Sequence, residues 1–343
     1  MHKKAVYEIG AQSVRLENPV YIVESASVCG SKESRGRFAE YFDMTSEDDK
    51  FGEKNWEAAE STMQKLAVEI LLEKARISRN EIHFIFAGDL LGQSMATSFG
   101  LKELDLPLFG LYGACSTCGE ALSLGAMAIA GGFATNVVCV TSSHYASAEK
   151  EFRFPLEYGG QRPPAAGYTA TASGAFLLSV NPGKNPLAKI TGFTAGKIMD
   201  YGIKDSFNMG CAMAPAAMNV IATHLKDFGR KIEEYDKIVT GDLGKVGSEA
   251  LQTLLCLQNI DMESIHEDCG ILMYKEEQEN IGAGGSGCGC SASILACHFL
   301  KKIQVGSYHR ILFIPTGALL SKTSFNEGQN VLGIAHGVCI EHI

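Results

Sequence analysis

Basic residues are in short supply in this chain, which has 30 Lys and Arg against 39 Asp and Glu and a net charge of −9. No stretch gathers its lysines and arginines into a cluster. Proteins that bind nucleic acids ordinarily present such a positive surface to neutralise phosphates. We therefore expect no nucleic-acid partner.

Targeting features are missing as well. The chain does not open with a basic segment followed by an apolar run, so we expect no signal peptide. Residues 121–140 carry no charge and are long enough to span a bilayer, but Gly131, Gly132 and Asn136 interrupt them. A buried helix followed by a buried strand explains this run better, and we expect no transmembrane segment.

Cysteine, in contrast, is plentiful. The eleven cysteines are odd in number and scattered, which predicts reduced thiols in a reducing compartment. Cys115 and Cys118 form a C-x-x-C pair, and Cys288 and Cys290 form a second cluster. Cys118 is expected inside a buried helix, however, and the C-x-C spacing suits zinc poorly. We predict neither a metal site nor redox chemistry from these four thiols.

Residues 108–131 predict a short apolar strand, a sharp turn and a helix with small residues at Ala121, Gly125 and Ala128. Small residues let a helix pack close to its neighbours, so this helix is expected to be buried. Cys115 lies at the turn, where unpaired N–H groups and the helix dipole lower a thiol pKa and favour a nucleophilic thiolate. A free cysteine is more often a small, inert, buried residue. The residues alone leave both readings open.

The order of elements is repeated along the chain. A predicted helix is followed by a predicted strand that is closed by Gly88-Asp89-Leu90. The same order of helix and strand recurs before Gly241-Asp242-Leu243. A second match follows Cys115 and Cys290, each of which leads through a helix to an apolar strand. The matched positions of Asp89 and Asp242 favour shared turn chemistry over catalysis.

Two such halves predict an α/β fold layered α-β-α-β-α, with two mixed five-stranded sheets around two buried helices. The turn-rich stretch 181–186 places the boundary, giving an N-terminal half of residues 1–181 and a C-terminal half of residues 182–343.

The glycine-rich run 282–289 does not predict a nucleotide site. It lacks the Gly-Lys-Ser/Thr ending of a phosphate-binding loop and follows no convincing strand. Its glycines are better suited to bring the backbone close to a cavity and to begin a helix. No cofactor is expected.

Several of these segments together resemble the thiolase-like superfamily and, more closely, the stage V sporulation protein AD family of endospore-forming bacteria. The resemblance is carried by the turn Gly113-Ala-Cys115-Ser, the duplicated half and the glycine-rich run. The closer match comes from residues 87–91, 109–117, 141–144, 152–161, 213–217, 284–288 and 316–321. It implies a thiolase fold and a role in handling dipicolinic acid, the pyridine-2,6-dicarboxylate packed into spores.

The chain departs from the enzymes that it resembles. Condensing thiolases carry Gly-His-Pro before the second buried helix and ketosynthases carry an Asn, whereas Ser286 stands at that position here. The second cysteine of thiolases is missing near residues 315–317. A partner histidine remains available at His266, where ketosynthases place theirs. The nucleophile Cys115 is thus kept while its usual partners are partly lost.

Further candidate residues lie near the expected strand ends. His144 follows a strand and His336 lies near the C-terminus, although a lone histidine is usually structural. Arg153 and Arg162 belong to a charged loop, which is solvated by default but is placed to cover a site. A planar dicarboxylate favours arginine, which grips it bidentately. The expected ligand-binding set is Cys115, His144, Arg153, Arg162, His266, Ser286 and His336.

Three functions follow as expectations. The first is a binder of dipicolinic acid, free or as its calcium chelate, that supports its uptake into the developing spore. The second is an acyltransferase or condensing enzyme that uses Cys115, His266 and an acyl-CoA. The third is a structural subunit that needs no ligand. The resemblance further implies a homodimer, cytoplasmic or peripheral on the spore inner membrane, with other subunits of a membrane-associated sporulation transport complex as partners.

Overall fold

The computed structural model describes residues 9–152 and 162–343. The strands are β1 (Ser13–Cys29), β2 (Met44–Thr45), β3 (Phe84–Gly88), β4 (Leu108–Gly110), β5 (Asn136–Ser143), β6 (Tyr168–Thr169), β7 (Ala172–Ser179), β8 (Ala188–Thr194), β9 (Lys237–Thr240), β10 (His266–Asp268), β11 (Gly285–Ser286), β12 (Arg310–Ile314), β13 (Thr316–Leu319), β14 (Leu332–Ala335) and β15 (Gly337–Glu341).

The α-helices are α1 (Trp56–Ala75), α2 (Met95–Leu101), α3 (Thr117–Ala130), α4 (Tyr145–Phe152), α5 (Met209–Phe228), α6 (Gly244–Cys256), α7 (Cys269–Met273), α8 (Cys288–Ile294), α9 (Leu300–Gln304) and α10 (Lys322–Asn326). A π-helical turn, Leu295–Phe299, joins α8 to α9. Asn55 begins α1 by accepting the N–H of Ala58 at 2.8 Å. Gly229, with φ of +62°, ends α5.

The main sheet is continuous. Its strands follow the order β10-β9-β12-β15-β8-β1-β7-β5-β3-β4, and β2 pairs with β1. The prediction of two separate five-stranded sheets is therefore wrong. The two sets of five strands join through β1: Ser13–Arg15 and Val20–Ile22 pair with β8, while the part from Tyr21 to Cys29 pairs with β7.

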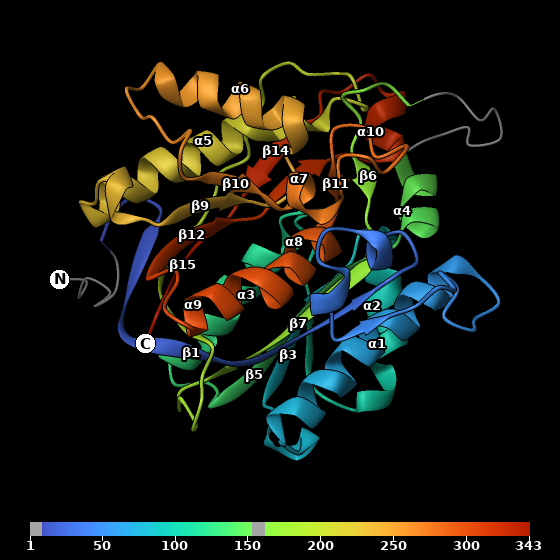
Figure 1. The fold of residues 1–343 in the computed structure, drawn as a ribbon, viewed down its shortest axis with the longest axis vertical. Helices are drawn as coiled ribbons and strands as arrows, with labels where there is room; N and C mark the ends of the chain where they lie inside the picture. Colours follow the sequence, from blue (N-terminus) through green and yellow to red (C-terminus); the bar gives the residue numbers. More distant parts are fainter. Residues whose placement is uncertain (1–8, 153–161) are drawn as a thin grey trace.

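The layered arrangement is visible in Figure 1 in spite of this junction. Helices α5 and α6 cover one outer face, over β9, β12 and β15, and α1 and α2 cover the other, over β7, β5 and β3. Helices α3 and α8 lie between the two sets of strands. Helix α3 contacts β5 and β3 on one side and β15 on the other. The division of the chain at residue 181, which lies between β7 and β8, stays a prediction.

Small residues allow the central helices to approach the strands. A Cβ added at Gly125 of α3 would lie 2.8 Å from Cys139 Sγ and 3.0 Å from Leu178 Cδ1. A Cβ at Gly174 of β7 would lie 2.5 Å from the backbone of Ala292 in α8. Both contacts are closer than folded proteins tolerate, so a larger residue requires the layers to separate.

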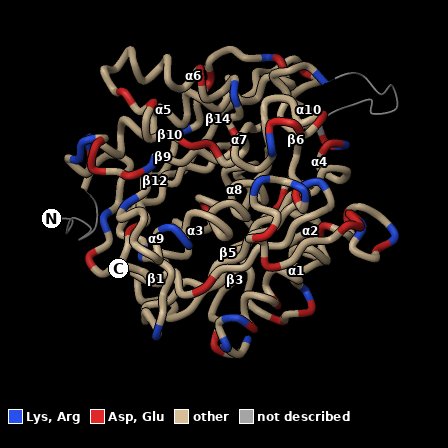
Figure 2. Tube along the Cα trace, viewed as in Figure 1, with Lys and Arg blue, Asp and Glu red and all other residues tan. Residues whose placement is uncertain are grey.

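The uncharged run at residues 121–140 is the end of α3 and the start of β5, as the sequence predicts. Within residues 9–152 and 162–343, no helix is both long and apolar enough to cross a membrane. Figure 2 shows Lys and Arg interspersed with Asp and Glu along the outer elements.

Candidate functional site

Cys115 lies in a tight turn between β4 and α3. The turn is closed by the N–H of Ser116, which donates to the carbonyl of Gly113 at 3.0 Å, and by the N–H of Thr117, which donates to Ala114 at 3.2 Å. Ala114 has φ of +50°, a left-handed conformation that is rare outside glycine. Such strain often marks functional positions. The sequence-based placement of Cys115 immediately before a buried helix is confirmed.

Asp242 faces this turn from the second half of the chain. It follows β9, and its carboxylate accepts three hydrogen bonds from two segments of the chain. Ser286 Oγ of β11 donates at 3.0 Å, the N–H of Gly287 donates at 2.9 Å, and Thr316 Oγ1 of β13 donates at 2.9 Å. Asp242 is only 5% exposed. These three donors fix its position and favour its ionised form, while burial has the larger effect and raises the pKa of Asp242 above its usual value.

The Cys115 thiol lies within hydrogen-bonding reach of the Asp242 carboxylate and the Ser286 hydroxyl. Burial, and then the negative charge of Asp242, raise the pKa of Cys115 well above its usual value. The expectation of a lowered thiol pKa is wrong. Desolvation and a neighbouring carboxylate both disfavour the thiolate, and they outweigh the helix dipole, which is worth about 1 kcal/mol at most surface sites. Cys115 is a buried thiol, 7% exposed.

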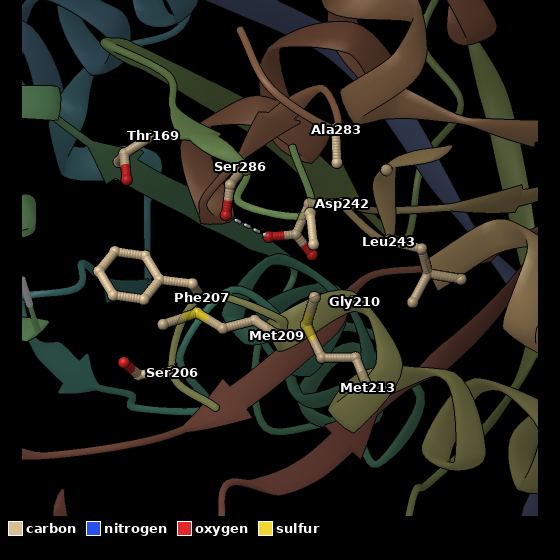
Figure 3. Close-up of a pocket in the computed structure, with 13 residues that line it drawn as sticks. Thr169, Ser206, Phe207, Met209, Gly210, Met213, Asp242, Leu243, Ala283 and Ser286 are labelled. Carbon is tan, nitrogen blue, oxygen red and sulfur yellow. Dashed lines mark hydrogen bonds between the residues drawn. The ribbon is translucent and has the colours of Figure 1, made fainter. Parts of the chain in front are cut away.

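A small cavity lies beside this pair (Figure 3). Its lining includes Thr169, Phe207, Met213, Asp242 and Ser286. In the close-up, Ser286 and Asp242 point toward one another, with the apolar side chains of Phe207 and Met213 on the other side of the space. The cavity has about 20 Å³ of room, enough for one water molecule. Among the lining side chains that belong to residues 9–152 and 162–343, Asp242 is the ionisable one.

Backbone pairing places Ser286 at this cavity. The short strands β6 and β11 pair in parallel, which sets Thr169 beside Ser286. Gly287, with φ of +103°, then turns the chain into α8, and a Cβ there would lie 2.5 Å from Ser143 Oγ. Only glycine fits this turn without strain. The glycine-rich run therefore brings backbone to a cavity and begins a helix, as its composition predicts.

Arg162 lies behind the cavity wall. Its guanidinium donates to Glu149 Oε1 at 3.3 Å and to the carbonyl of Gly167, and it lies over the rings of Tyr145 and Tyr168. Gly167 lines the cavity, so the arginine is close to the site. Arg153 lies outside the described residues.

Two of the candidate histidines form hydrogen bonds with backbone groups. His144 is buried; its Nδ1 accepts from the N–H of Ala146, and its Nε2 donates to the carbonyl of Asp49 at 2.7 Å. His336 Nδ1 accepts from the N–H of Gly196 at 3.3 Å. Burial lowers the pKa of both, to about 4 for His336. Neither lines the cavity.

His266 lies on β10, one strand beyond Asp242. Its Nε2 donates to Thr240 Oγ1 at 2.9 Å, since that hydroxyl donates in turn to Asp268 at 2.7 Å. Burial lowers its pKa to about 4. The ionisable group with the largest effect on Cys115 is Asp242. The pairing of Cys115 with His266 therefore stays a prediction, whereas the structure brings Cys115, Ser286 and Asp242 together.

Asp242 is the site residue that sequence reasoning assigned to turn chemistry alone. Its counterpart Asp89 does fit that role, since it accepts from the N–H groups of Leu91 and Thr97, both at 2.8 Å. One feature of the sequence pointed toward such a residue. The residues that accompany the nucleophilic cysteine in the related enzymes are partly missing here, so Cys115 had no known partner. All eleven cysteines are free thiols, and the described residues contain no group of three or more His, Cys, Asp or Glu arranged for a metal ion.

Comparison with known proteins gives the family. Residues 10–341 match the model of the stage V sporulation protein AD family. Stage V sporulation protein AD of Bacillus subtilis (strain 168) is 40% identical over 332 residues, which is 97% of each chain. The chain belongs to the stage V sporulation protein AD family.

Two solved enzymes are similar to this chain in structure. 3-Oxoacyl-[acyl-carrier-protein] synthase III from Aquifex aeolicus matches with a TM-score of 0.57 and 15% identity, over 94% of this chain and 99% of the other. Human mitochondrial 3-ketoacyl-CoA thiolase matches with a TM-score of 0.56 and 11% identity, over 96% and 99%. These likenesses establish the α/β thiolase-like fold.

Proposed function

We propose that the chain binds dipicolinic acid and supports its uptake into the developing spore. The observation that carries this proposal is the replacement of catalytic partners by a carboxylate. Asp242, anchored by three donors, faces the buried Cys115 thiol. An acyl-transfer site needs a thiolate, a base and an oxyanion hole. A buried cysteine whose pKa is raised suits acyl transfer poorly, and the cavity beside Asp242 is better suited to hold a molecule than to transform it.

The charge of the cavity constrains the form of the ligand. Dipicolinate is a dianion near pH 7, and the ionisable side chain in the cavity lining is the carboxylate of Asp242. A buried anion beside a second anion is costly without compensation. A calcium chelate of dipicolinate is neutral and offers the metal as a partner for Asp242. We therefore propose the chelate as the form that enters.

The size of the cavity adds a second condition. The cavity volume of about 20 Å³ is far below the volume of about 300 Å³ or more that is usual for ligand pockets. The apolar side chains of Phe207, Met209 and Met213 line it. Binding therefore requires these side chains to move, and we propose that the segment carrying Phe207 opens on ligand entry.

Titration calorimetry with matched ligands tests the proposal. Dipicolinate is titrated with and without equimolar calcium, and isophthalate, which has the same carboxylates but lacks the ring nitrogen that chelates metal, is the control. We expect saturable binding that is at least tenfold tighter with calcium, and no such gain for isophthalate. Absence of saturable dipicolinate binding in either condition would contradict the proposal.

A working acyltransferase is the second candidate, favoured by the placement of Cys115 in a strained turn before a buried helix. Mass spectrometry after incubation with acyl-CoA distinguishes the two. An adduct on Cys115 that is absent from Cys115→Ala would support the enzyme. An unmodified Cys115 together with saturable dipicolinate binding would support the binder.

The cellular context is part of the same proposal. We infer a homodimer that acts in the cytoplasm or at the surface of the spore inner membrane, alongside the membrane-associated subunits of a sporulation transport complex. The dimer inference is supported by β4, the last strand of the sheet, where Leu108 is 40% and Phe109 is 51% exposed. Exposed apolar edge strands are prone to pair with another chain.

A further inference from the structure

A buried carboxyl group joins helix α4 to helix α1. Glu60 of α1 is 0% exposed. Its Oε2 accepts a hydrogen bond from Ser147 Oγ of α4 at 2.6 Å, and its Oε1 accepts from Ser142 Oγ of β5 at 3.0 Å. Within residues 9–152 and 162–343 these two hydroxyls are its hydrogen-bond partners, and no lysine or arginine forms an ion pair with it. A buried carboxylate without a cation is costly, so these surroundings favour the neutral acid.

The contacts of Ser147 accommodate the proton of that acid. The Ser147 hydroxyl lies 3.2 Å from the carbonyl oxygen of His144 as well as 2.6 Å from Glu60 Oε2. A hydroxyl has one proton to donate. With Glu60 ionised, Ser147 donates to only one of these two acceptors. With Glu60 neutral, the acid donates to Ser147 Oγ and Ser147 donates to His144, so both contacts are hydrogen bonds.

A second carboxyl group, that of Asp89, disfavours a charge on Glu60. Besides the two backbone N–H groups described above, Asp89 accepts from Thr97 Oγ1 at 2.6 Å, and three donors favour its ionised form. Gln64 of α1 links the two acids, since its Nε2 donates to Thr97 Oγ1 at 3.2 Å and to Ser142 Oγ at 3.1 Å. Glu60 is therefore the acid that takes the proton. In agreement, burial, and then Asp89, raise the pKa of Glu60 to about 8.

The other ionisable groups that face Glu60 from the described elements are paired elsewhere or uncharged. Glu57, one turn earlier on α1, forms an ion pair with Lys150 of α4. Burial lowers the pKa of His144, so this imidazole is neutral above its usual value of 6.5. Cys288 of α8 donates its thiol proton to a backbone carbonyl of β5 at 2.9 Å, and burial raises its pKa well above the usual value. A charge on Glu60 would thus lack a nearby counter-charge among these groups.

Helix α4 also supports the cavity beside Asp242. Glu149, two residues after Ser147, is 1% exposed, and its Oε1 accepts from Thr169 Oγ1 at 3.2 Å and from Arg162 at 3.3 Å. Thr169 lines the cavity. A movement of α4 therefore reaches the cavity wall.

We propose that Glu60 is a pH-dependent latch that holds α4, and with it this cavity wall, while its proton is bound. Release of α4 brings water to the Glu60 carboxyl, which then loses its proton to the solvent as an ordinary acid does. Because the closed state has the higher pKa, closure is most favourable at low pH. It weakens by about tenfold per pH unit above about pH 4.5 and levels off above about 8. The proposal goes beyond the proposed function, because it concerns the protein without any ligand.

Hydrogen–deuterium exchange of the α4 amides, followed by mass spectrometry on the full chain between pH 6 and pH 9, measures this closure. At each pH the exchange rate is divided by the intrinsic rate of an unfolded peptide of the same sequence, and α6 is the reference helix. In the wild type we expect the protection of α4 to fall at least tenfold between pH 6 and pH 8 and to stay level above about 8, with that of α6 unchanged. Protection of α4 that does not depend on pH would overturn the proposal, and so would α4 amides that are already unprotected at pH 6.

Glu60→Gln is the decisive variant, because the amide keeps the shape of the neutral acid and a hydrogen-bond donor but cannot ionise. The protection of α4 in this variant should not vary with pH. A fall as large as that of the wild type would overturn the proposal, because another group would then control the helix.

Glu57→Gln, one turn away on the same helix, is the matched control and should keep the wild-type fall. Loss of the fall in this control would contradict the proposal, because the effect would then belong to the ion pair of Glu57 with Lys150. If circular dichroism shows Glu60→Gln to be unfolded, Asp89→Asn takes its place. Removal of that second charge should make the fall end at a lower pH, and an unchanged end point would contradict the proposal.

Discussion

The hydroxyl of Tyr274, at the end of α7, donates a hydrogen bond to the carboxyl of Glu33, which lies in the segment between β1 and β2. Both side chains are fully buried. Within the part of the chain that the structure describes, the second oxygen of Glu33 has no hydrogen-bond partner. Burial raises the pKa of Glu33 from its usual 4.5 to about 7. The two halves of the chain are thus linked by a carboxyl group that titrates near neutrality.

This pair predicts a pH-dependent stability. Because the folded pKa is raised, the folded state holds a proton that the unfolded state loses above about pH 4.5. The contribution of Glu33 is present below that pH and is lost as the pH rises through about 7, a change of about 3 kcal/mol. Glu33→Gln cannot titrate, so its free energy of unfolding relative to the wild type should increase between pH 5 and pH 8. Urea unfolding at both values measures it; equal differences would contradict the assignment.

Close packing at α3 predicts a strong effect of one added methyl group. Gly125→Ala places a Cβ within 2.8 Å of Cys139 Sγ, and overpacking of this kind costs about 1–3 kcal/mol. The control is Gly92→Ala, where nothing lies within 4 Å of the added carbon, and its effect should stay within about 0.5 kcal/mol. Thermal unfolding of both variants checks this. Equal stabilities of the two variants would mean that α3 is not closely packed against its neighbouring strands.

The exposed edge of β4 predicts an oligomeric state that a single charge can change. Phe109→Lys introduces a charge at the end of the sheet, where Phe109 stacks on Phe86 with ring centroids 5.2 Å apart. Sedimentation velocity should give a dimer for the wild type and a monomer for Phe109→Lys. Leu257→Lys, at an equally apolar residue that is 79% exposed after α6, should leave the dimer intact. A monomeric wild type at micromolar concentration would contradict the prediction.

Removal of the Cys115 side-chain sulfur should leave the fold intact. Cys115 packs among the buried residues Leu90, Ala148 and Cys288, and Cys115→Ala leaves a space of about one methyl group, costing about 1 kcal/mol. Urea unfolding gives the value. A loss of more than about 3 kcal/mol would contradict this prediction, because it would exceed the cost of removing one methyl-sized group.

Local patterns in the sequence predicted much of the fold. The apolar run before Gly88, the small residues of α3 and the repeated order of elements identified β3, α3 and the layers around them, because period and residue size act over short distances. The single sheet was missed because it depends on the first part of β1 pairing with β8, more than 160 residues away, while the rest of β1 pairs with β7. β1 is partly polar, and no local sequence pattern specifies which strands lie beside such a strand.

The site was predicted in part for a similar reason. Cys115 and Ser286 were found because turns and glycine-rich runs have local signatures. The raised pKa of the Cys115 thiol was not predicted, because it comes from burial and then from Asp242, whose carboxylate is held by donors on β11 and β13. Histidines were expected at the site, yet His144 and His336 satisfy backbone groups. Side-chain direction depends on tertiary packing, which composition and spacing do not contain.

A crystal structure with the calcium chelate of dipicolinate bound tests the central claim most directly. We expect the ligand beside Asp242 and Ser286, with the metal within about 2.3–2.6 Å of a carboxylate oxygen of Asp242, an unmodified Cys115 and a displaced Phe207. A ligand bound elsewhere with this cavity still closed, or a covalent group on Cys115, would contradict the account.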